Sequence, residues 1–431
     1  MAAYKQRVAY FQEALHTPVI NLRKLRTLCF SGIPEGAGIR ALCWMLMLGY
    51  LPPEKENWKN VLARQRELYK QFVHEIIIEQ CRGIKSGKNE NNVHVDHPLN
   101  PNPDSRWLGY FKDNEVLLQI DKDCRRLCPD ISFFQVATKY PCEDVIGENK
   151  DFETLRKRVQ SQHLEASHVN TSRVGITNLS LLVLGIGGTI DSIAMQVTTS
   201  KKIATEEYNV LEEGQEAHWE VVERILFVYA KLNPGIAYVQ GMNEILGPLY
   251  YVLASHPSPD WQEHAEADAF FCFTNLMSEI RDNFIKSLDE SATGIGSMMQ
   301  NVLNLIKERD LELWISLEKQ QMKPQFYSFR WLTLMLSQEF PLPDVIRVWD
   351  SLFADERRFE FLIFVCCAMH MVIRNDLLKG DFVTSMKLLQ NYPDIDIHSI
   401  LSKAIELKHP RAVPPPPREK QTKPGFPLKK R

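Results

Sequence analysis

Two short segments of this chain carry side chains that could act on a charged reaction centre. The first is Ile120-Asp121-Lys122-Asp123-Cys124-Arg125-Arg126. Asp123 and Arg126 are three residues apart, so they are neighbours on the surface of a helix. A carboxylate at that spacing can orient the guanidinium while the long side chain projects past the helix end. A permanent planar cation held in this way suits phosphoryl transfer, because it can neutralise charge on phosphate oxygens.

This segment also has an ordinary structural interpretation. Pro129 is expected to end the helix within one turn of Arg126. Basic residues are common in the last turn of a helix, where they face the negative end of the helix dipole. The adjacent Arg125 leaves open which arginine projects. Helical geometry favours Arg126, because Arg125 lies about 100° further round, away from the side of Asp123.

The second segment runs from Asn233 to Asn243 and reads NPGIAYVQGMN. Its proline ends a helix, and Tyr238 and Gln240 then lie on a short exposed bridge. A glutamine amide has both a donor and an acceptor, so it can orient a water molecule while bonding to a partner's main chain. Gly241 would let a partner's backbone approach closely. Taken alone, Tyr238 and Gln240 also fit a helix cap and a buried hydrogen bond.

Motifs for other kinds of catalysis are weak in this sequence. There is no GxSxG, HExxH or P-loop lysine motif. The glycine-rich stretch 185–188 lacks the Lys-Ser/Thr pair of a phosphate loop and is better explained as a hinge. Cys124 and Cys128 lie beside arginines, but without a matching histidine signature they are expected to be core cysteines. We therefore expect no metal site and no cofactor in this chain.

Helices must position the two segments, because most of the chain has the 3.6-residue apolar period. Residues 217–232 place one apolar face ahead of a proline, and residues 299–317 repeat the pattern. Residues 326–336 and 359–375 have the length and apolar character of buried helices. Alternating strand patterns are nearly absent, and residues 93–95 are the best candidate. The sequence predicts an all-α fold of many helices.

Composition and charge restrict the class of protein. The chain has 431 residues, 44% of them hydrophobic, a net charge of -3 and a pI near 6.5. This balance provides no field that would attract nucleic acid or a membrane surface. Nine cysteines without CxxC spacing are typical of reduced thiols in the cytosol. Residues 1–16 form an amphipathic helix rather than a signal peptide, and the apolar run Phe361–Ile373 is shorter than the roughly 20 residues that span a membrane. We expect a soluble, cytoplasmic protein.

Three polar segments interrupt the helical pattern. Residues 83–105 are expected to be mainly loop. Residues from about 143 to 216 resemble an insertion whose ends meet at the surface, because long surface loops cost little closure entropy. The tail 406–431 is basic and contains Pro414–Pro417, so we expect it to be disordered or polyproline II. Such a tail is a candidate ligand for an SH3-type domain, although it fits a plain spacer as well.

Together and in this order, the motifs resemble those of the TBC-domain family, the Rab GTPase-activating proteins. The family patterns Ile-x-x-Asp-x-x-Arg and Tyr-x-Gln-Gly-Met are matched by Ile120, Asp123 and Arg126, and by Tyr238, Gln240, Gly241 and Met242. Supporting blocks of the family resemble Gly32-Ile33-Pro34 with Arg40 and Trp44, Asp96-His97-Pro98-Leu99 with Trp107 and Phe111, Trp331-Leu332-Thr333-Leu334, and Val348-Trp349-Asp350. We interpret the three tryptophans at 44, 331 and 349 as core residues, and Arg40 and Asp350 as structural ion pairs or caps.

The resemblance implies a multi-helix TBC-type domain over residues 31–405, preceded by a helical lead-in at 1–30. The insertion at about 143–216 separates the two motifs, whereas most of the family joins them by a shorter route. It could cover the site, help to choose the partner or simply extend from the domain. The family usually has a small or apolar residue and proline before the arginine, where this chain has Cys124-Arg125.

The resemblance also implies a mechanism with two residues supplied in trans to a GTP-bound Rab GTPase. Arg126 would neutralise charge on the γ-phosphate, and Gln240 would position the attacking water in place of the GTPase's own glutamine. Asp123 would hold Arg126, and Tyr238 would brace the glutamine loop against the partner. GTP and Mg²⁺ would belong to the GTPase, which would also bring the protein peripherally to membranes.

Two alternatives remain from the sequence. The same fold could bind a GTP-loaded Rab as a non-catalytic effector or scaffold. The other alternative is a helical interaction scaffold that is unrelated to GTPases and uses the proline-rich tail as its ligand segment. The presence of both Arg126 and Gln240 favours the activator, because a pure binding protein does not need both.

Overall fold

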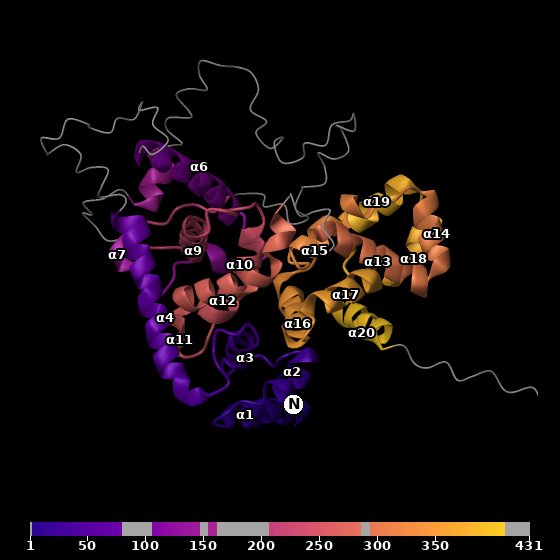
Figure 1. Ribbon diagram of the computed structural model, residues 1–431, viewed down its shortest axis with the longest axis horizontal. Helices are drawn as coiled ribbons and strands as arrows, with labels where there is room; N and C mark the ends of the chain where they lie inside the picture. Colours follow the sequence, from indigo (N-terminus) through magenta and orange to yellow (C-terminus); the bar gives the residue numbers. More distant parts are fainter. Residues whose placement is uncertain (1, 80–105, 147–153, 162–206, 286–293, 410–431) are drawn as a thin grey trace, which may run out of the picture.

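The structure is a computed structural model that describes residues 2–79, 106–146, 154–161, 207–285 and 294–409. Within these ranges the regular elements are helices, and the strand-like pairings are two isolated bridges. The predicted all-α fold is confirmed (Figure 1). The candidate strand at 93–95, the polar loop 83–105, the glycine-rich stretch 185–188 and the tail from residue 410 lie outside the described residues.

The first part of the chain forms one group of helices, on the left and at the bottom of Figure 1. Its members are α1 (Ala2–His16), α2 (Leu22–Phe30), α3 (Ile39–Met47), η1 (Lys55–Asn57), α4 (Trp58–Val73), the π-helical η2 (His74–Glu79), α6 (Arg106–Cys124), η4 (Phe133–Gln135), α7 (Glu143–Ile146), α9 (His218–Leu232), α10 (Met242–Ala254), α11 (Pro259–Gln262), α12 (Ala265–Ile280) and η7 (Arg281–Phe284).

The last part of the chain forms a second group, on the right of Figure 1. Its members are α13 (Ile295–Arg309), α14 (Leu311–Lys319), η9 (Pro324–Phe326), α15 (Ser328–Thr333), α16 (Leu342–Ala354), α17 (Arg358–Val372), α18 (Arg374–Lys379), α19 (Phe382–Gln390) and α20 (Ile397–Lys408). The helix α16 lies between the two groups in this view and packs against α2, α3 and α10.

The helix α9 is the centre of the first group, as the apolar stretch 217–232 predicts. It packs against α6, α10 and α12, and its residues from Trp219 to Ala230 are buried. Its buried charged residues Glu220 and Arg224 are held there in ion pairs. The Glu220 side chain accepts the Ala217 N–H at 2.8 Å and so satisfies one of the free donors before the helix. The helix ends at Leu232, just before Pro234.

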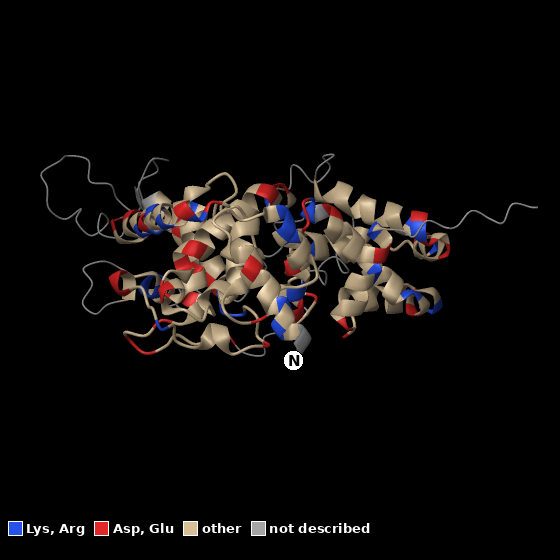
Figure 2. Ribbon diagram, turned by 90° about the horizontal axis from the view of Figure 1, so that it is seen from below, with Lys and Arg blue, Asp and Glu red and all other residues tan. Residues whose placement is uncertain are grey.

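The helix α17 is the corresponding core helix of the second group. It packs against α13, α15 and α20. Its residues 361–369 are all buried or half-buried, which confirms that the apolar run belongs to the core. Among the described residues, none of the helices has the length and apolar character that crossing a bilayer requires. Basic and acidic residues are intermixed along the helices (Figure 2).

One buried carboxylate joins the N-terminal helices to α16. Asp350 is fully buried, and it accepts hydrogen bonds from the Ile33 N–H at 2.8 Å and Trp44 Nε1 at 2.9 Å. Arg40 Nε is 3.2 Å from the same carboxylate. The predicted structural role of Arg40 and Asp350 is therefore confirmed. Burial raises the pKa of Asp350, while Arg40 and these hydrogen bonds oppose the rise.

Two of the helices predicted from the sequence are interrupted in the structure. The stretch 299–317 is divided between α13 and α14, because Asp310 leaves the helical conformation and caps α14 by accepting the Leu313 N–H at 3.0 Å. Arg374 binds the same carboxylate at 2.5 Å. The stretch 326–336 contains the last residue of η9 and the short helix α15. Helix α15 does not continue because Met335 and Leu336 have left-handed φ values of 50° and 65°.

The described parts of the segment 143–216 begin and end at the same place. Ala137 and Ala217 form an antiparallel bridge, and the Cys142 N–H donates to the Glu216 side chain at 3.0 Å. Glu216 also forms an ion pair with the buried Arg224 of α9. The chain therefore leaves the core and returns to it at one anchored point.

Replacing Asp350 by alanine is expected to destabilise the protein by about 3–5 kcal/mol, because two buried donors and Arg40 lose their shared acceptor. Urea unfolding of the whole chain measures this loss. The exposed Asp376 provides a control, whose replacement by alanine should change the free energy of unfolding by about 0.5 kcal/mol or less. Equal effects of the two substitutions would contradict the central role of Asp350.

The buried His370 and the half-buried His218 predict a loss of stability in acid. Burial lowers the pKa of His370 to about 4, and the pKa of His218 to about 4 as well. Between about pH 6.5 and pH 4 the unfolded chain binds protons that the native protein does not, so the free energy of unfolding falls as the pH falls through this window. For His370 the loss reaches about 3 kcal/mol.

The change is measured by urea unfolding at several pH values, together with an NMR titration of the His370 ring. We expect His370→Gln to flatten the dependence between pH 6.5 and 4, whereas the same change at the exposed His398 should leave it unaltered. Protonation of the His370 ring above pH 6 in the folded protein would show the prediction to be wrong.

Candidate functional site

The arginine segment lies at the C-terminal end of α6. The helix ends at Cys124, so Arg126 lies in the turn that follows rather than in the last helical turn. The Arg126 N–H donates to the Asp123 carbonyl at 3.3 Å, and the Leu127 N–H donates to the Cys124 carbonyl at 3.1 Å. These bonds tighten the end of the helix into a 3₁₀-like turn. Cys128 then adopts a left-handed conformation with a φ of 45°.

The structure separates the roles of the two neighbouring arginines. Arg125 is directed inward: its Nε donates to both carboxylate oxygens of Asp121 at 3.0 and 2.9 Å, and its guanidinium lies 4.5 Å from the ring centroid of Trp219. The Arg125 side chain is 15% exposed, whereas that of Arg126 is 47% exposed. Arg126 is therefore the arginine that a partner can reach.

Asp123 lies next to Arg126 and is almost fully buried. Its Oδ2 accepts from the Tyr238 hydroxyl at 2.7 Å and from Gln119 Nε2 at 3.2 Å. Arg126 Nη2 is 3.9 Å from Oδ1, and Arg126 Nε donates to the Lys122 carbonyl at 2.9 Å. Burial raises the pKa of Asp123, while these hydrogen bonds and Arg126 oppose the rise. The contact with Arg126 is loose, so the guanidinium can leave it at little cost.

The glutamine segment forms the connection between α9 and α10. Gln240 is exposed at its end. Gly241 has a φ of 101°, and a Cβ built on it would lie 2.7 Å from Leu334 Cδ2. The structure thus gives an internal reason for the glycine, because the left-handed backbone strains any other residue and a side chain would require Leu334 to shift. The neighbouring Ala237 is also left-handed, with a φ of 55°.

Tyr238 joins the two segments, which are 115 residues apart in sequence at this contact. Its hydroxyl binds Asp123, and it lies 3.4 Å from Asn243 Oδ1. Asn243 Nδ2 in turn donates to the Asp123 carbonyl at 3.2 Å. Burial holds the pKa of Tyr238 far above its usual value, so the hydroxyl remains a donor. The expectation that Tyr238 braces the glutamine loop against the partner is therefore wrong, because its hydroxyl is turned inward and braces the loop against the arginine segment of its own chain.

Three residues that contact Asp123 or the turn after α6 were given no role from the sequence. Gln119 lies four residues before Asp123, a spacing that could have indicated the contact. Asn243 is the last residue of the glutamine segment and the second residue of α10. An asparagine at that place is only a weak indication of its contact with Asp123. Tyr208 contacts the turn after α6, and nothing in the local sequence around it indicates this contact.

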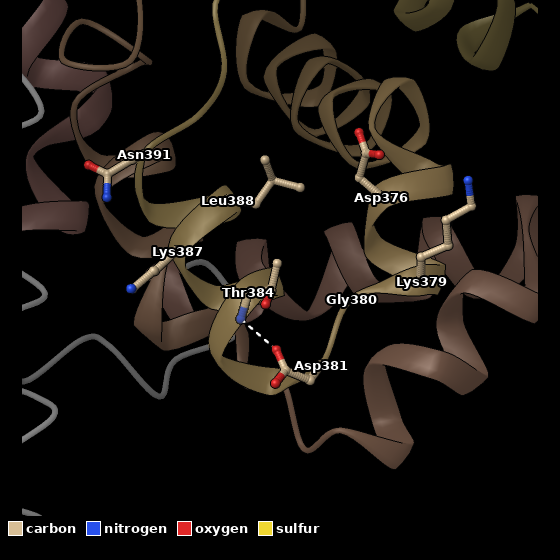
Figure 3. A pocket seen from close by; sticks show the side chains of 8 residues that line it. All are labelled: Asp376, Lys379, Gly380, Asp381, Thr384, Lys387, Leu388 and Asn391. Carbon is tan, nitrogen blue, oxygen red and sulfur yellow. Dashed lines mark hydrogen bonds between the residues drawn. The ribbon is translucent and has the colours of Figure 1, made fainter.

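A hollow away from the two segments lies in the second group of helices. Figure 3 shows a hollow between α18 and α19 that is lined by Lys379, Asp381 and Lys387 among others. Asp381 caps α19 there by accepting the Thr384 N–H at 2.9 Å, so its carboxylate already has a structural role. Across the described ranges, no three His, Cys, Asp or Glu side chains gather closely enough to hold a metal ion. Cys124 and Cys128 are buried, as expected of core cysteines.

Known proteins resemble this chain in sequence and in fold. The Rab-GTPase-TBC domain matches residues 196–378. TBC1 domain family member 13 of Homo sapiens is 58% identical over 407 residues, which cover 94% of this chain and 98% of that protein. A TBC domain-containing protein of Schizosaccharomyces pombe is 39% identical over 455 residues, which cover 95% of this chain and 73% of that protein.

A solved structure supports the fold alone. The crystal structure of the Ypt/Rab-GAP domain of Gyp1p aligns with a TM-score of 0.61 at 21% identity, covering 94% of this chain and 97% of that one. The sequence motifs also resemble those of the member 13 branch, and its human and Mus musculus representatives, both 58% identical, confirm this resemblance. The fold, the domain match and the relatives agree, and the chain belongs to the TBC-domain family.

Proposed function

We propose that this protein is a GTPase-activating protein for a Rab-type small GTPase, to which it supplies Arg126 and Gln240 in trans. Membership of the TBC-domain family supports a Rab as the partner. One observation carries the mechanism: the hydrogen bond from Tyr238 to Asp123 joins the two motifs, while Arg126 and Gln240 both remain exposed. We assign the activity to the domain predicted over residues 31–405.

Arg126 acts on the charge that develops during phosphoryl transfer. The γ-phosphate oxygens and the leaving oxygen carry this charge in the transition state, and a guanidinium can bind two of them at once. Arg126 needs only to leave its loose contact with Asp123 and its bond to the Lys122 carbonyl. Because the turn already directs it outward, little side-chain ordering remains for the moment of binding.

Gln240 acts on the attacking water. Its amide oxygen can accept a proton of the water while its amide nitrogen donates to a carbonyl of the GTPase. The position of the loop is defined by Tyr238 on one side and by the contact between Gly241 and Leu334 on the other. Such preorganisation is what positions a nucleophile in line for attack.

The partner also determines where the protein acts. A GTP-loaded Rab is the proposed partner, and neither nucleic acid nor direct membrane binding is required. We propose that the protein is cytoplasmic and meets membranes through the Rab. The proposed SH3-type ligand at Pro414–Pro417 lies outside the described residues.

Replacing Arg126 by lysine is expected to lower the stimulated rate of GTP hydrolysis by about 10³-fold or more, because lysine lacks the planar pair of donors. A 10³-fold loss corresponds to about 4 kcal/mol of transition-state stabilisation, and the 10⁵-fold effect of the strongest such arginines corresponds to about 7 kcal/mol. Phosphate release from a panel of GTP-loaded Rabs measures the rate. Arg357→Lys, at an exposed arginine whose side chain is 81% accessible, provides the matched control.

An unchanged rate in Arg126→Lys, for the Rab on which the wild type is most active, would overturn the mechanism. A wild type that binds GTP-loaded Rab without accelerating hydrolysis would instead establish the effector or scaffold alternative.

Replacing Gln240 by alanine is expected to lower the stimulated rate by about 10²-fold, while binding of GTP-loaded Rab changes only a few-fold, since the amide acts on the water rather than on affinity. Phosphate release and equilibrium binding are measured in parallel, with the exposed Gln71→Ala as the control. The wild type should also stimulate a Rab whose own catalytic glutamine is replaced by alanine. Failure to do so would show that the GTPase, and not Gln240, positions the water.

A further inference from the structure

The return of the chain from the segment 143–216 lies directly against the turn that carries Arg126. Tyr208, which is buried, makes the contacts. Its N–H donates to the Arg125 carbonyl at 2.9 Å, and its own carbonyl accepts from Arg125 Nη1 at 2.7 Å. Its hydroxyl donates to the Leu127 carbonyl at 2.7 Å and lies 3.3 Å from the Cys128 carbonyl.

These contacts satisfy carbonyls of the turn that follows α6. Carbonyls at the end of a helix and just beyond it have no partner within the helix and need one from elsewhere. Cys128 has a left-handed φ of 45°, which is unfavourable for a residue other than glycine and persists only where surrounding contacts hold it. Arg126 lies between Arg125 and Leu127, and Tyr208 binds both of these neighbours. The direction of the backbone at Arg126 therefore depends on Tyr208.

The same segment holds α6 at a second point. Arg158, which is buried, donates from Nε to Asn114 Oδ1 at 2.9 Å. Its guanidinium lies 4.8 Å from the ring centroid of Tyr110 and 5.3 Å from that of Phe227. Asn114 and Tyr110 are in the first half of α6, whereas Tyr208 binds beyond its end. The segment thus fixes α6 on both sides of the Asp123 cluster.

We propose that Tyr208 is a positioning residue for Arg126, and that the segment 143–216 thereby keeps the arginine aimed at the bound GTPase. This inference rests on the proposed function and adds a residue that neither the motifs nor the comparisons assign. Tyr208 touches neither substrate nor nucleotide and acts through the turn at 125–128.

The test uses the full chain with Tyr208→Phe, which keeps the ring and removes only the hydroxyl. We expect kcat for the most responsive GTP-loaded Rab to fall by about tenfold, while KM changes less than about threefold, because misplacement of the arginine affects the transition state more than binding. Amide hydrogen exchange over residues 125–131 should become about fivefold faster in the isolated protein.

Tyr392→Phe is the matched control. Its hydroxyl is also buried and donates to a backbone carbonyl, that of Met369 at 2.9 Å, in the second group of helices. This variant should lose a comparable amount of stability and leave both kcat and exchange at 125–131 unchanged. A double-mutant cycle provides the sharpest readout: in the Arg126→Lys background, Tyr208→Phe should cause no further loss of kcat.

The outcomes separate this inference from the proposed function. If the wild type accelerates no Rab, the proposed function and this inference both fall. If the wild type is active and Tyr208→Phe keeps its kcat, only the positioning role is overturned. The same holds if Tyr208→Phe lowers kcat by an equal factor in the wild type and in the Arg126→Lys variant. An equal loss of kcat in Tyr392→Phe would likewise assign the effect to general destabilisation.

Discussion

The hydrogen bond from the Tyr238 hydroxyl to Asp123 is the contact on which the site depends. It joins a loop between two core helices to the end of a third helix. A buried carboxylate is costly unless donors surround it, and Asp123 has Tyr238, Gln119 and the nearby Arg126. The contact thus stabilises the fold locally and fixes the two chemically active segments relative to each other.

The neighbouring pairs Asp121–Arg125 and Asp123–Arg126 show how the same residue types serve opposite purposes. Asp121 and Arg125 form a close contact, in which Arg125 Nε donates to both carboxylate oxygens, and the guanidinium lies over the ring of Trp219 in the interior. Asp123 and Arg126 are 3.9 Å apart and half of the arginine is exposed. An arginine held tightly inside cannot reach a partner, whereas one held loosely at the surface is oriented and still able to move.

The segment between the two motifs also supports the helix that carries the arginine. Its ends are anchored near Ala137 and Ala217, and inside those anchors Tyr208 and Arg158 contact α6. A segment that lengthens the connection between the motifs therefore also supports one of them. Its attachment through the buried ion pair of Glu216 with Arg224 makes the anchor expensive to separate.

The sequence by itself determined the helical class and the core helices at 217–232 and 359–375. These features follow from local periodicity. That Arg126 is more exposed than Arg125 was decided by the tertiary structure, because both arginines lie in the turn beyond the end of α6. Only the tertiary structure decided that Tyr238 binds Asp123 and that Tyr208 holds the turn after α6. Those partners are 115 and about 80 residues apart, and contacts across such distances leave no periodic trace in either segment, because they depend on where whole helices pack.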